Sequence, residues 1–320
     1  MKMKKGPRLI ALTLLLIVAL NVPSYGWSNI GHMAVAFVAY QKLKPQVRKR
    51  VDALVSLNPK FKFWLTLIPA GTAPDKKRMM LFMIAATWAD QIKGDGEHQS
   101  DGPHDGNRPP DDGTAARNIG YTDTAMHKYW HFIDRPFSLD GTPTPPAPVP
   151  NAMTQIAAFR SVLASNSPDL LKSYDLVWLL HLVGDVHQPL HCAARFGQDQ
   201  LDGDDGGNKV TVCDPQCNKR LHAFWDGLLG TPLDPSLAVK VGQTLPPAPV
   251  NLAGKLDEET WITESFEAAQ SRVYKNPPIG LGAGPFKLTK QYRNAAHTLA
   301  NQRVALAGAR LANILNKELK

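Results

Sequence analysis

Residues 181–191, His-Leu-Val-Gly-Asp-Val-His-Gln-Pro-Leu-His, concentrate side chains that bind metal ions. The segment follows an apolar run that predicts a helix, and on a helix His181 and Asp185, four residues apart, share one face. Pro189 should end or bend that helix just before His191. Imidazole nitrogens and carboxylate oxygens are usual zinc ligands. The pair can therefore bind one metal while His191 is directed at another, although a capped core helix with a few polar residues would look the same.

A second pair with the same spacing, His222 and Asp226, lies in residues 220–229, which also predict a helix. Because the same His/Asp spacing occurs twice, a chance arrangement of these residues becomes a weaker explanation. Further candidates are more ordinary when taken singly, since a carboxylate near a helix end usually forms a cap or an ion pair. They are Asp90 with Lys93 three residues later, His131 followed by Phe132 and Asp134, and His32 near a helix start.

The N-terminus has the pattern of a secretory signal peptide over residues 1–26. A basic segment precedes an apolar run at 9–20, which is too short for a comfortable membrane span, and the small residues Ser24 and Gly26 follow. An uncleaved anchor is the alternative. Cleavage after Gly26 would leave Trp27 with a free α-amine, a possible metal ligand, in a secreted or periplasmic protein without a membrane span. The leader holds four of the eight net positive charges, so the mature chain is only mildly basic and permits, without demanding, an anionic substrate.

The remaining chain predicts one predominantly α-helical domain, residues 27–320, with long loops. We predict a short extended segment at 128–136 and a short strand at 209–212. The loop at 94–120 is rich in Gly, Asp and Pro, and we expect His98 and His104 in it to be solvated. His127, His187 and His297 are expected to be structural or to support ligands. Helices are predicted at 27–41, 45–57, 78–92, 152–164, 170–186, 220–229, 258–274 and 288–319.

The chain has three cysteines, and an exported protein matures in an oxidising compartment. Cys213 and Cys217 could close a small disulfide loop, leaving Cys192 free. A zinc clip is the less favoured alternative, because there is no second cysteine pair. The absence of an Asn-x-Ser/Thr acceptor agrees with a bacterial type of exported protein.

The candidate metal ligands outnumber the roughly four that one zinc needs. With bridging they would suit two or three ions. Several divalent ions held close together favour cleavage of phosphate esters, because they generate hydroxide near neutral pH and stabilise both the phosphoryl and the leaving oxygen. The candidates are Trp27 (amine), His32, Asp90, His131, His181, Asp185, His191, His222 and Asp226.

The order and local spacing of these nine residues resemble the trinuclear-zinc, single-strand-specific nucleases (the nuclease S-one/P-one family), in a bacterial-type member. The resemblance covers the whole mature chain. It rests on 27–32 (Trp-Ser-Asn-Ile-Gly-His), 88–90 (Trp-Ala-Asp), 131–134 (His-Phe-Ile-Asp), 181–191, 222–226 and the Ala-Gly-Ala-Arg-Leu-Ala run at 307–312.

The resemblance implies three Zn²⁺ ions. One would be bound by Asp90, His131, His181 and Asp185, and a second by His191, His222 and Asp226. The third would take the amine and carbonyl of Trp27, His32 and Asp185, which bridges to the first.

The family resemblance also implies a reaction. Such enzymes cleave the bond between phosphorus and the 3′ oxygen of single-stranded RNA and DNA, give 5′-phosphorylated products, and remove 3′-phosphates from nucleotides. By similarity, water between the first and third metals attacks with help from Asp90, and the second zinc stabilises the leaving oxygen. Phe132 would stack on a base and Asp134 would accept hydrogen bonds from its edge, which requires an unpaired base. A monomer is expected.

Two residues depart from the family pattern. Ser28 stands where many members have Gly, which should change little. Lys93 stands where the best-known members have Arg near the phosphate, so the charge is kept and the bidentate geometry is lost.

Two alternative functions remain open. A zinc phospholipase C shares the fold and ligand order, but its last ligand is typically Glu and its first His lies further from the Trp. A non-catalytic metal-binding protein would bind zinc and cleave nothing.

Overall fold

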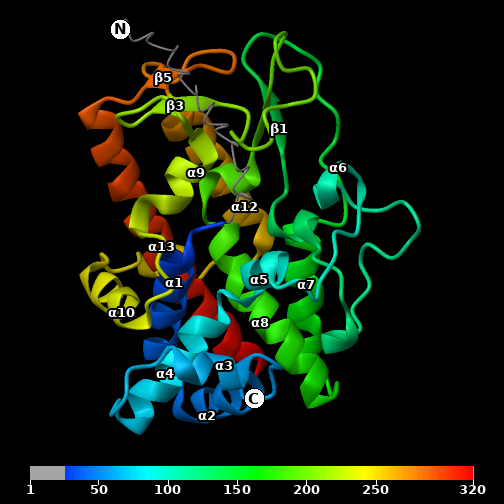
Figure 1. Cartoon of the computed structure of the whole chain (residues 1–320), viewed down its shortest axis with the longest axis vertical. Coiled ribbons are helices and arrows are strands. Elements are labelled where there is room, and N and C mark those ends of the chain that lie inside the picture. The colour runs from blue at the N-terminus through cyan, green and yellow to red at the C-terminus, as the bar shows by residue number, and fades with distance from the viewer. Residues whose placement is uncertain (1–25, 320) are drawn as a thin grey trace, which may run out of the picture.

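Three long helices form the centre of the structure, a computed structural model that describes residues 26–319 (Figure 1). They are α1 (Asn29–Lys42), α8 (Asp169–Asp185) and α13 (Lys290–Glu318). Every residue of α8 from Lys172 to Asp185 is buried, so its sequence shows no amphipathic period. Gly308 of α13 lets α1 approach closely, because a Cβ atom there would lie 2.6 Å from Val38 Cβ. The predicted leader lies outside the described residues except for Gly26.

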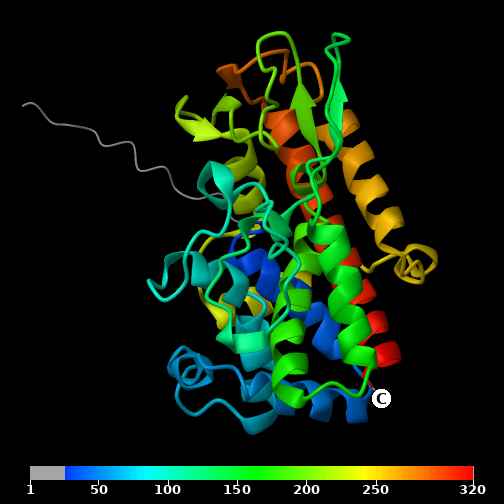
Figure 2. The ribbon, with the colours of Figure 1, turned by 90° about the vertical axis from the view of Figure 1, so that its right-hand side faces the viewer.

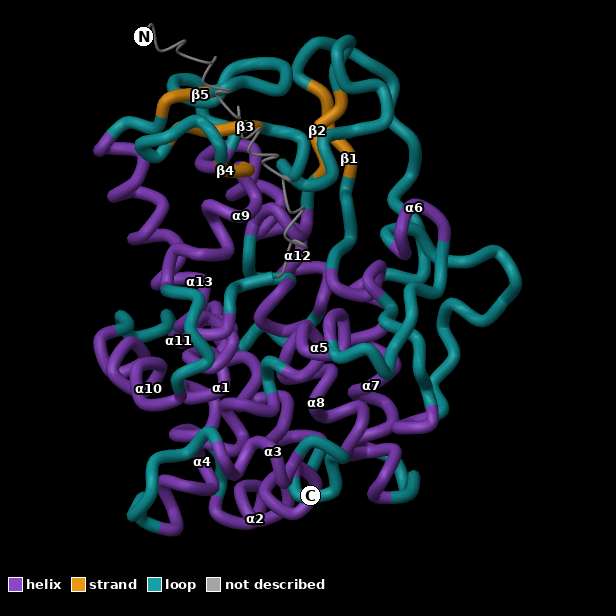
Figure 3. The backbone as a smooth tube through the Cα atoms, in the orientation of Figure 1, coloured by secondary structure: helices purple, strands orange, loops and turns teal. Residues whose placement is uncertain are grey.

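Shorter helices surround this centre (Figure 3). Figure 2 shows α7 and α8 side by side, with α13 next to them. The surrounding α-helices are α2 (Pro45–Val55), α3 (Phe61–Thr66), α4 (Pro74–Ala85), α5 (Trp88–Gln91), α6 (Pro103–Gly106), α7 (Ala152–Ala164), α9 (Leu221–Asp226), α10 (Pro235–Thr244), α11 (Val250–Ala253) and α12 (Glu258–Ala268). Single turns of other helix types are η1 (Ile92–Gly94), η2 (Gly120–Thr122), η3 (Lys128–His131), η4 (Pro189–Cys192), η5 (Gly227–Leu229) and the π turn η6 (Ala269–Val273).

The strands are short and gather at one end of the molecule, the top in Figure 1. There β1 (Pro136–Ser138) pairs in parallel with β2 (Ala194–Phe196). In the second sheet β3 (Thr211–Cys213) lies between β4 (Lys219–Arg220), antiparallel, and β5 (Phe286–Lys287), parallel. The predicted predominantly helical fold class is therefore confirmed.

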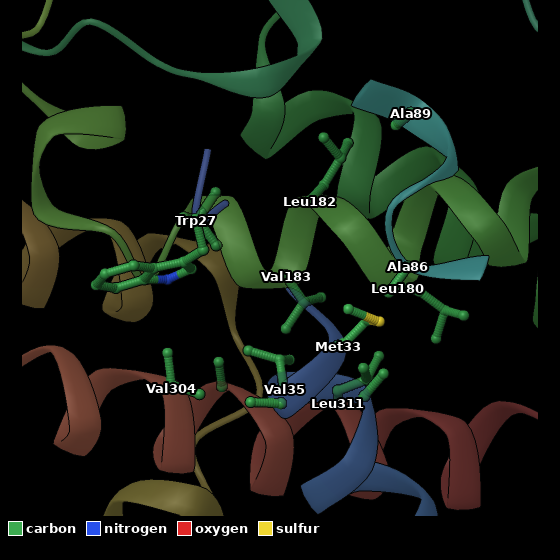
Figure 4. Packing of buried hydrophobic residues seen from close by; sticks show 14 of the residues in the cluster. Trp27, Met33, Val35, Ala86, Ala89, Leu180, Leu182, Val183, Val304 and Leu311 are labelled. Atoms are coloured by element: carbon green, nitrogen blue, oxygen red, sulfur yellow. The ribbon is translucent and has the colours of Figure 1, made fainter. Parts of the chain in front are cut away.

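The core fills the space between α1, α8 and α13. Figure 4 shows Met33 and Val35 of α1, Val183 of α8 and Val304 of α13 around one apolar layer, with the indole of Trp27 at its edge. All of these side chains are completely buried. Trp27 is thus anchored by the core immediately before α1 begins. None of the helices within residues 26–319 has the length and apolarity needed to cross a membrane.

Several sequence expectations about single elements were wrong. The predicted helix at 78–92 begins earlier, at Pro74, and breaks after Ala85 into α4 and α5. The stretch 128–136, predicted as extended, starts with the turn η3, because His127 before it has left-handed dihedrals (φ 45°, ψ 46°). The predicted helix 258–274 leaves α-geometry at Ala269. Helices α3, α6, α10 and α11 were not predicted.

Candidate metal centre

The candidate ligands come from six different elements and meet where α8 ends. His181 and Asp185 lie on the last turns of α8, and His32 on the first turn of α1. The others are Asp90 of α5, His131 of η3, His191 of η4, and His222 and Asp226 of α9. All eight side chains are buried. Their donor atoms form three groups, each within 4.8 Å: His32/Asp90/His181, His131/His181/Asp185 and His191/His222/Asp226.

The first two groups adjoin through His181. Its Nε2 lies 3.0 Å from His131 Nδ1, 3.2 Å from Asp185 Oδ2 and 3.5 Å from Asp90 Oδ1. His131 Nδ1 is also 3.0 Å from Asp185 Oδ2. His181 Nδ1 donates to the carbonyl of Ala86 at 2.8 Å, and since a carbonyl only accepts, Nε2 is left with its lone pair directed at the group.

The break between α4 and α5 creates that hydrogen bond. In an unbroken helix Asp90 N would donate to the Ala86 carbonyl, whereas here it donates to Thr87 O at 3.2 Å. The freed Ala86 carbonyl fixes the tautomer and orientation of His181. The interruption that the sequence did not reveal therefore serves the site.

In the third group, His191 and His222 are oriented in the same way, by hydrogen bonds from Nδ1 to backbone carbonyls. His191 Nδ1 donates to His131 O and His222 Nδ1 donates to Gly206 O, each at 2.7 Å. Both Nε2 atoms must then carry lone pairs, yet they face each other at 3.1 Å. Two facing lone pairs repel unless a cation lies between them. Asp226 completes this group, with Oδ2 3.5 Å from His222 Nε2.

The N-terminal side of the centre is built around His32. Its ring stacks on His181 at 3.8 Å, and Gly184 leaves room for it, since a Cβ there would lie 2.8 Å from His32 Nδ1. His32 Nε2 and Asp185 Oδ1 are buried, 3.3 Å apart, and without a hydrogen-bond partner among the described residues. Gly26 lies against this pair, because a Cβ on it would be 1.7 Å from Asp185 Oδ1.

Charge in the centre is set by burial and by Lys93. Burial raises the pKa of Asp90, but Lys93 and His181 outweigh it and lower that pKa to about 2. Lys93 Nζ contacts Asp90 Oδ1 at 2.8 Å and is itself almost completely buried. Burial, aided by neighbouring cationic groups, lowers the pKa of His131 and of His222 to about 3. At neutral pH these imidazoles are neutral and the carboxylate is ionised, as metal ligation requires.

The donor set therefore fits divalent cations of the zinc type. Each group combines imidazole nitrogens with a carboxylate, the usual zinc donors. The facing lone pairs of His191 and His222 and the unpartnered atoms of His32 and Asp185 are explained by cations between them.

A cleft of about 890 Å³ opens beside the centre, large enough for a nucleotide-sized ligand. Its lining includes Lys93, Phe132 and Asp134, all singled out from the sequence, together with His191 and His222. Trp27 is not among the residues that line this cleft, and its side chain is completely buried.

Sequence reasoning missed the residues of the long loops that line the cleft. They include Arg108 and Lys209, and Lys128 at the start of η3 also lines the cleft. It also missed Gln188, whose Nε2 donates to Asp226 Oδ1 at 2.7 Å. Gln188 lies inside the His-rich segment and could have been found there. No pattern in the sequence marks the side chains of Arg108, Lys128 and Lys209.

The turn between Asp185 and His191 is clamped by α12 and α13. Arg303 Nε donates to His187 O at 3.1 Å, and Ser265 Oγ donates to Val186 O at 2.5 Å. Glu264 accepts from both Arg303 and Arg310, and Arg310 also donates to His187 Nε2 at 2.9 Å. The two arginine side chains are buried, whereas the Glu264 side chain is 23% exposed. The clamp fixes the spacing of Asp185 and His191, which belong to different donor groups.

The remaining histidines and cysteines fall largely as expected. His187 is structural in the clamp, and His127 is buried between Asp101 and Asp123. The expectation for His98 was wrong, because its side chain is mostly buried against Asp95, whereas His104 is exposed. A Cys213–Cys217 disulfide is present and Cys192 is free and buried, as predicted.

Comparison with known proteins agrees with this geometry. The chain is 27% identical to "Endonuclease 3" of Arabidopsis thaliana over 162 residues, which is 44% of this chain and 50% of that protein. It is 27% identical to "Endonuclease 4" of the same plant over 178 residues, 48% of this chain and 54% of that protein. The chain thus matches about half the length of these curated relatives. A family model described as S1/P1 Nuclease matches residues 27–320, the whole segment that carries the donor groups. The chain belongs to the S1/P1 nuclease family.

Proposed function

We propose that this chain is a zinc-dependent endonuclease that hydrolyses single-stranded RNA and DNA to 5′-phosphorylated products and removes 3′-phosphates from nucleotides. The observation that carries the proposal is the pair of imidazole lone pairs of His191 and His222, 3.1 Å apart beside a nucleotide-sized cleft. Family membership supports a nuclease, and the names of the plant relatives agree with it.

Three Zn²⁺ ions are the proposed cofactors. The first would be held by Asp90, His131, His181 and Asp185. The second would be held by His191, His222 and Asp226. The third would take Trp27, His32 and Asp185. When bound, such ions supply hydroxide near neutral pH and neutralise the charge of the phosphodiester.

The chain's own residues would position the substrate. Phe132 stacks on a base and Asp134 accepts hydrogen bonds from its edge, so the base must be unpaired, which gives a preference for single strands. Lys93 contributes positive charge near the phosphate. Because Lys93 Nζ holds Asp90 Oδ1, the Oδ2 atom of Asp90 is the one proposed to accept a proton from the attacking water.

The third metal requires a free amine on Trp27. Gly26 lies against Asp185 Oδ1 and His32 Nε2, the donors of that ion. We therefore propose that residues 1–26 are a leader removed during export, that the mature domain is 27–320, and that it acts as a secreted or periplasmic monomer.

The test uses chain whose N-terminus has been sequenced. It is incubated with single-stranded RNA and DNA, with a duplex of the same sequence and with 3′-nucleotides, each with and without chelator. We expect cleavage of the single strands and dephosphorylation of the nucleotides, abolished by chelation and restored by zinc. Phosphatidylcholine is the comparison substrate. Its hydrolysis without nucleic-acid cleavage would assign the chain to phospholipase C chemistry, and zinc binding with no hydrolysis at all would contradict an enzyme.

A further inference from the structure

The long loop at 94–126 supplies one wall of the cleft beside Phe132 and Asp134. Arg108, just after α6, lines the cleft together with these two residues. Asn107 lines both this cleft and a small adjoining hollow that Phe132 and Asp134 also border. The cleft therefore has an aromatic face, a carboxylate and a guanidinium around the same space.

Contacts with the rest of the chain hold this wall in place. Asp101 accepts from His127 N at 2.9 Å and from the hydroxyl of Tyr129 at 2.6 Å. Lys128 Nζ donates to Asp105 O at 2.8 Å. The loop also closes on itself, since a Cβ on Gly102 would lie 2.0 Å from Arg108 O. The segment 127–129 that anchors the loop leads directly into Phe132, so Arg108 and Phe132 are positioned by one unit.

Asp134 and Arg108 both line the cleft beside Phe132. Asp134 has a left-handed backbone conformation, with φ of 38°. Burial raises the pKa of Asp134 to about 7, and the Arg108 guanidinium opposes that shift. Both side chains line the same cleft, and no ion pair within 4.0 Å joins these two described residues. An acceptor and a donor stand apart with an aromatic face beside them.

We propose that Asp134 and Arg108 read the base stacked on Phe132 and that they select guanine. Guanine presents two adjacent donors, N1–H and the 2-amino group, which match the two oxygens of Asp134 in its ionised form. Its O6 acceptor lies next to them, where a guanidinium can donate. The proposal rests on the proposed function and names the base that the same site prefers.

The other bases fit this pair less well. Adenine and cytosine each set one amino donor beside a ring-nitrogen lone pair, which would face the carboxylate. Uracil and thymine have one N–H donor between two carbonyls, so a carbonyl oxygen would meet Asp134. An unpaired acceptor against a half-buried carboxylate is costly, and the mismatch should therefore discriminate.

The first experiment measures kcat/KM for the 3′-monophosphates of guanosine, adenosine, cytidine, uridine and inosine. We expect guanosine to be favoured over the three other common nucleosides by roughly 5- to 150-fold. Inosine keeps N1–H and O6 but lacks the 2-amino group, so it should fall by about tenfold relative to guanosine. Equal values for the five nucleotides would overturn the proposal.

Variants then assign the effect to the two side chains. Arg108→Ala should reduce kcat/KM for guanosine selectively, with partial rescue in Arg108→Lys. Asp134→Asn tolerates the left-handed backbone and should abolish the preference. Arg117→Ala is the control, because Arg117 is an exposed arginine of the same loop that does not line the cleft. An Arg108→Ala loss of equal size for every base would mean a phosphate contact and would contradict base reading.

Binding separates this inference from the proposed function. Calorimetric titration with the 5′-monophosphates of the same nucleosides needs no turnover. Tighter binding of the guanosine nucleotide that is lost in Asp134→Asn supports base reading, whether or not any substrate is hydrolysed. If no substrate is hydrolysed, only the nuclease proposal is refuted. Hydrolysis with indiscriminate binding keeps the nuclease and rejects the guanine preference.

Discussion

Lys93 is the residue whose contacts bear most directly on turnover. It is almost completely buried, and its ammonium lies 2.8 Å from Asp90 Oδ1 at the floor of the cleft. From this position it can both hold Asp90 ionised and attract a phosphate. The two roles affect the reaction more than they affect retention of the metals, since Lys93 is not itself a donor to them.

We therefore predict that Lys93→Ala lowers kcat by about 100-fold, the size expected when one buried cationic donor is removed from a reacting phosphate. The zinc content per chain should stay near that of wild type. Steady-state kinetics and metal analysis of the same preparations check both. Unchanged turnover would contradict the role of Lys93.

At the scale of elements, α12 and α13 act on the metal centre through a buried ionic clamp. Among the described residues, Glu264 is the only carboxylate that forms ion pairs with Arg303 and Arg310, and both arginines are buried. Arg303 and Arg310 in turn hold His187, between Asp185 and His191. Loss of the carboxylate would leave two buried positive charges without compensation.

We predict that Glu264→Gln destabilises the fold by about 3–5 kcal/mol, as breaking a buried ion pair does. It should also speed the loss of zinc to a competing chelator, because the turn 185–191 is released. Thermal unfolding and chelator competition measure the two effects. Glu267→Gln, an exposed position on the same helix, is the control, and indistinguishable behaviour of the two variants would contradict the clamp.

Helix α8 contains a second buried carboxylate, Asp175. Burial raises its pKa to about 7, although the amide of Asn118 donates to both of its oxygens. The folded state thus binds this proton more tightly than the unfolded state, whose pKa is near 3.8. The contribution of Asp175 to the free energy of unfolding is fully present below pH 4 and is lost as the pH rises through 7. Asn118 Oδ1 is also buried without a hydrogen-bond partner among residues 26–319.

Asp175→Asn should therefore stabilise the protein at pH 8 by a few kcal/mol and have little effect near pH 4. An amide at 175 also offers Asn118 Oδ1 a donor. The difference in melting temperature between variant and wild type, followed from pH 4 to pH 8, is the measurement. Asp169→Asn on the same helix removes an exposed carboxylate whose pKa is lowered by Arg50, so it should not stabilise at pH 8. If the difference in melting temperature between Asp175→Asn and wild type did not change with pH, the raised pKa of Asp175 would be contradicted.

At the scale of the whole molecule, the sequence predicted the helical class and the helices 152–164 and 170–186, because long apolar segments with clear ends determine them. The histidines and aspartates that the sequence singled out lie close together in the structure, and their roles as metal ligands stay a prediction. The sequence could not predict the break at Ala86 and Thr87, since the carbonyl that the break frees is bound by His181, 95 residues away in the sequence. Arg108 was missed for the same reason: its loop has no period and is held by distant contacts.

The account as a whole depends on a third cation bound by the α-amine of Trp27. In the chain that retains Gly26 this residue lies against Asp185 Oδ1 and His32 Nε2, and Trp27 has a peptide nitrogen in place of an amine. Amine and carbonyl together form a chelate that no internal residue can provide. Processing at this bond would therefore complete the centre.

The most direct test counts zinc by native mass spectrometry in two proteins, one beginning at Trp27 and one beginning at Tyr25, in which Gly26 and Trp27 both have peptide nitrogens. The account predicts three zinc ions per chain in the first and two in the second. Equal zinc content in the two proteins would contradict it.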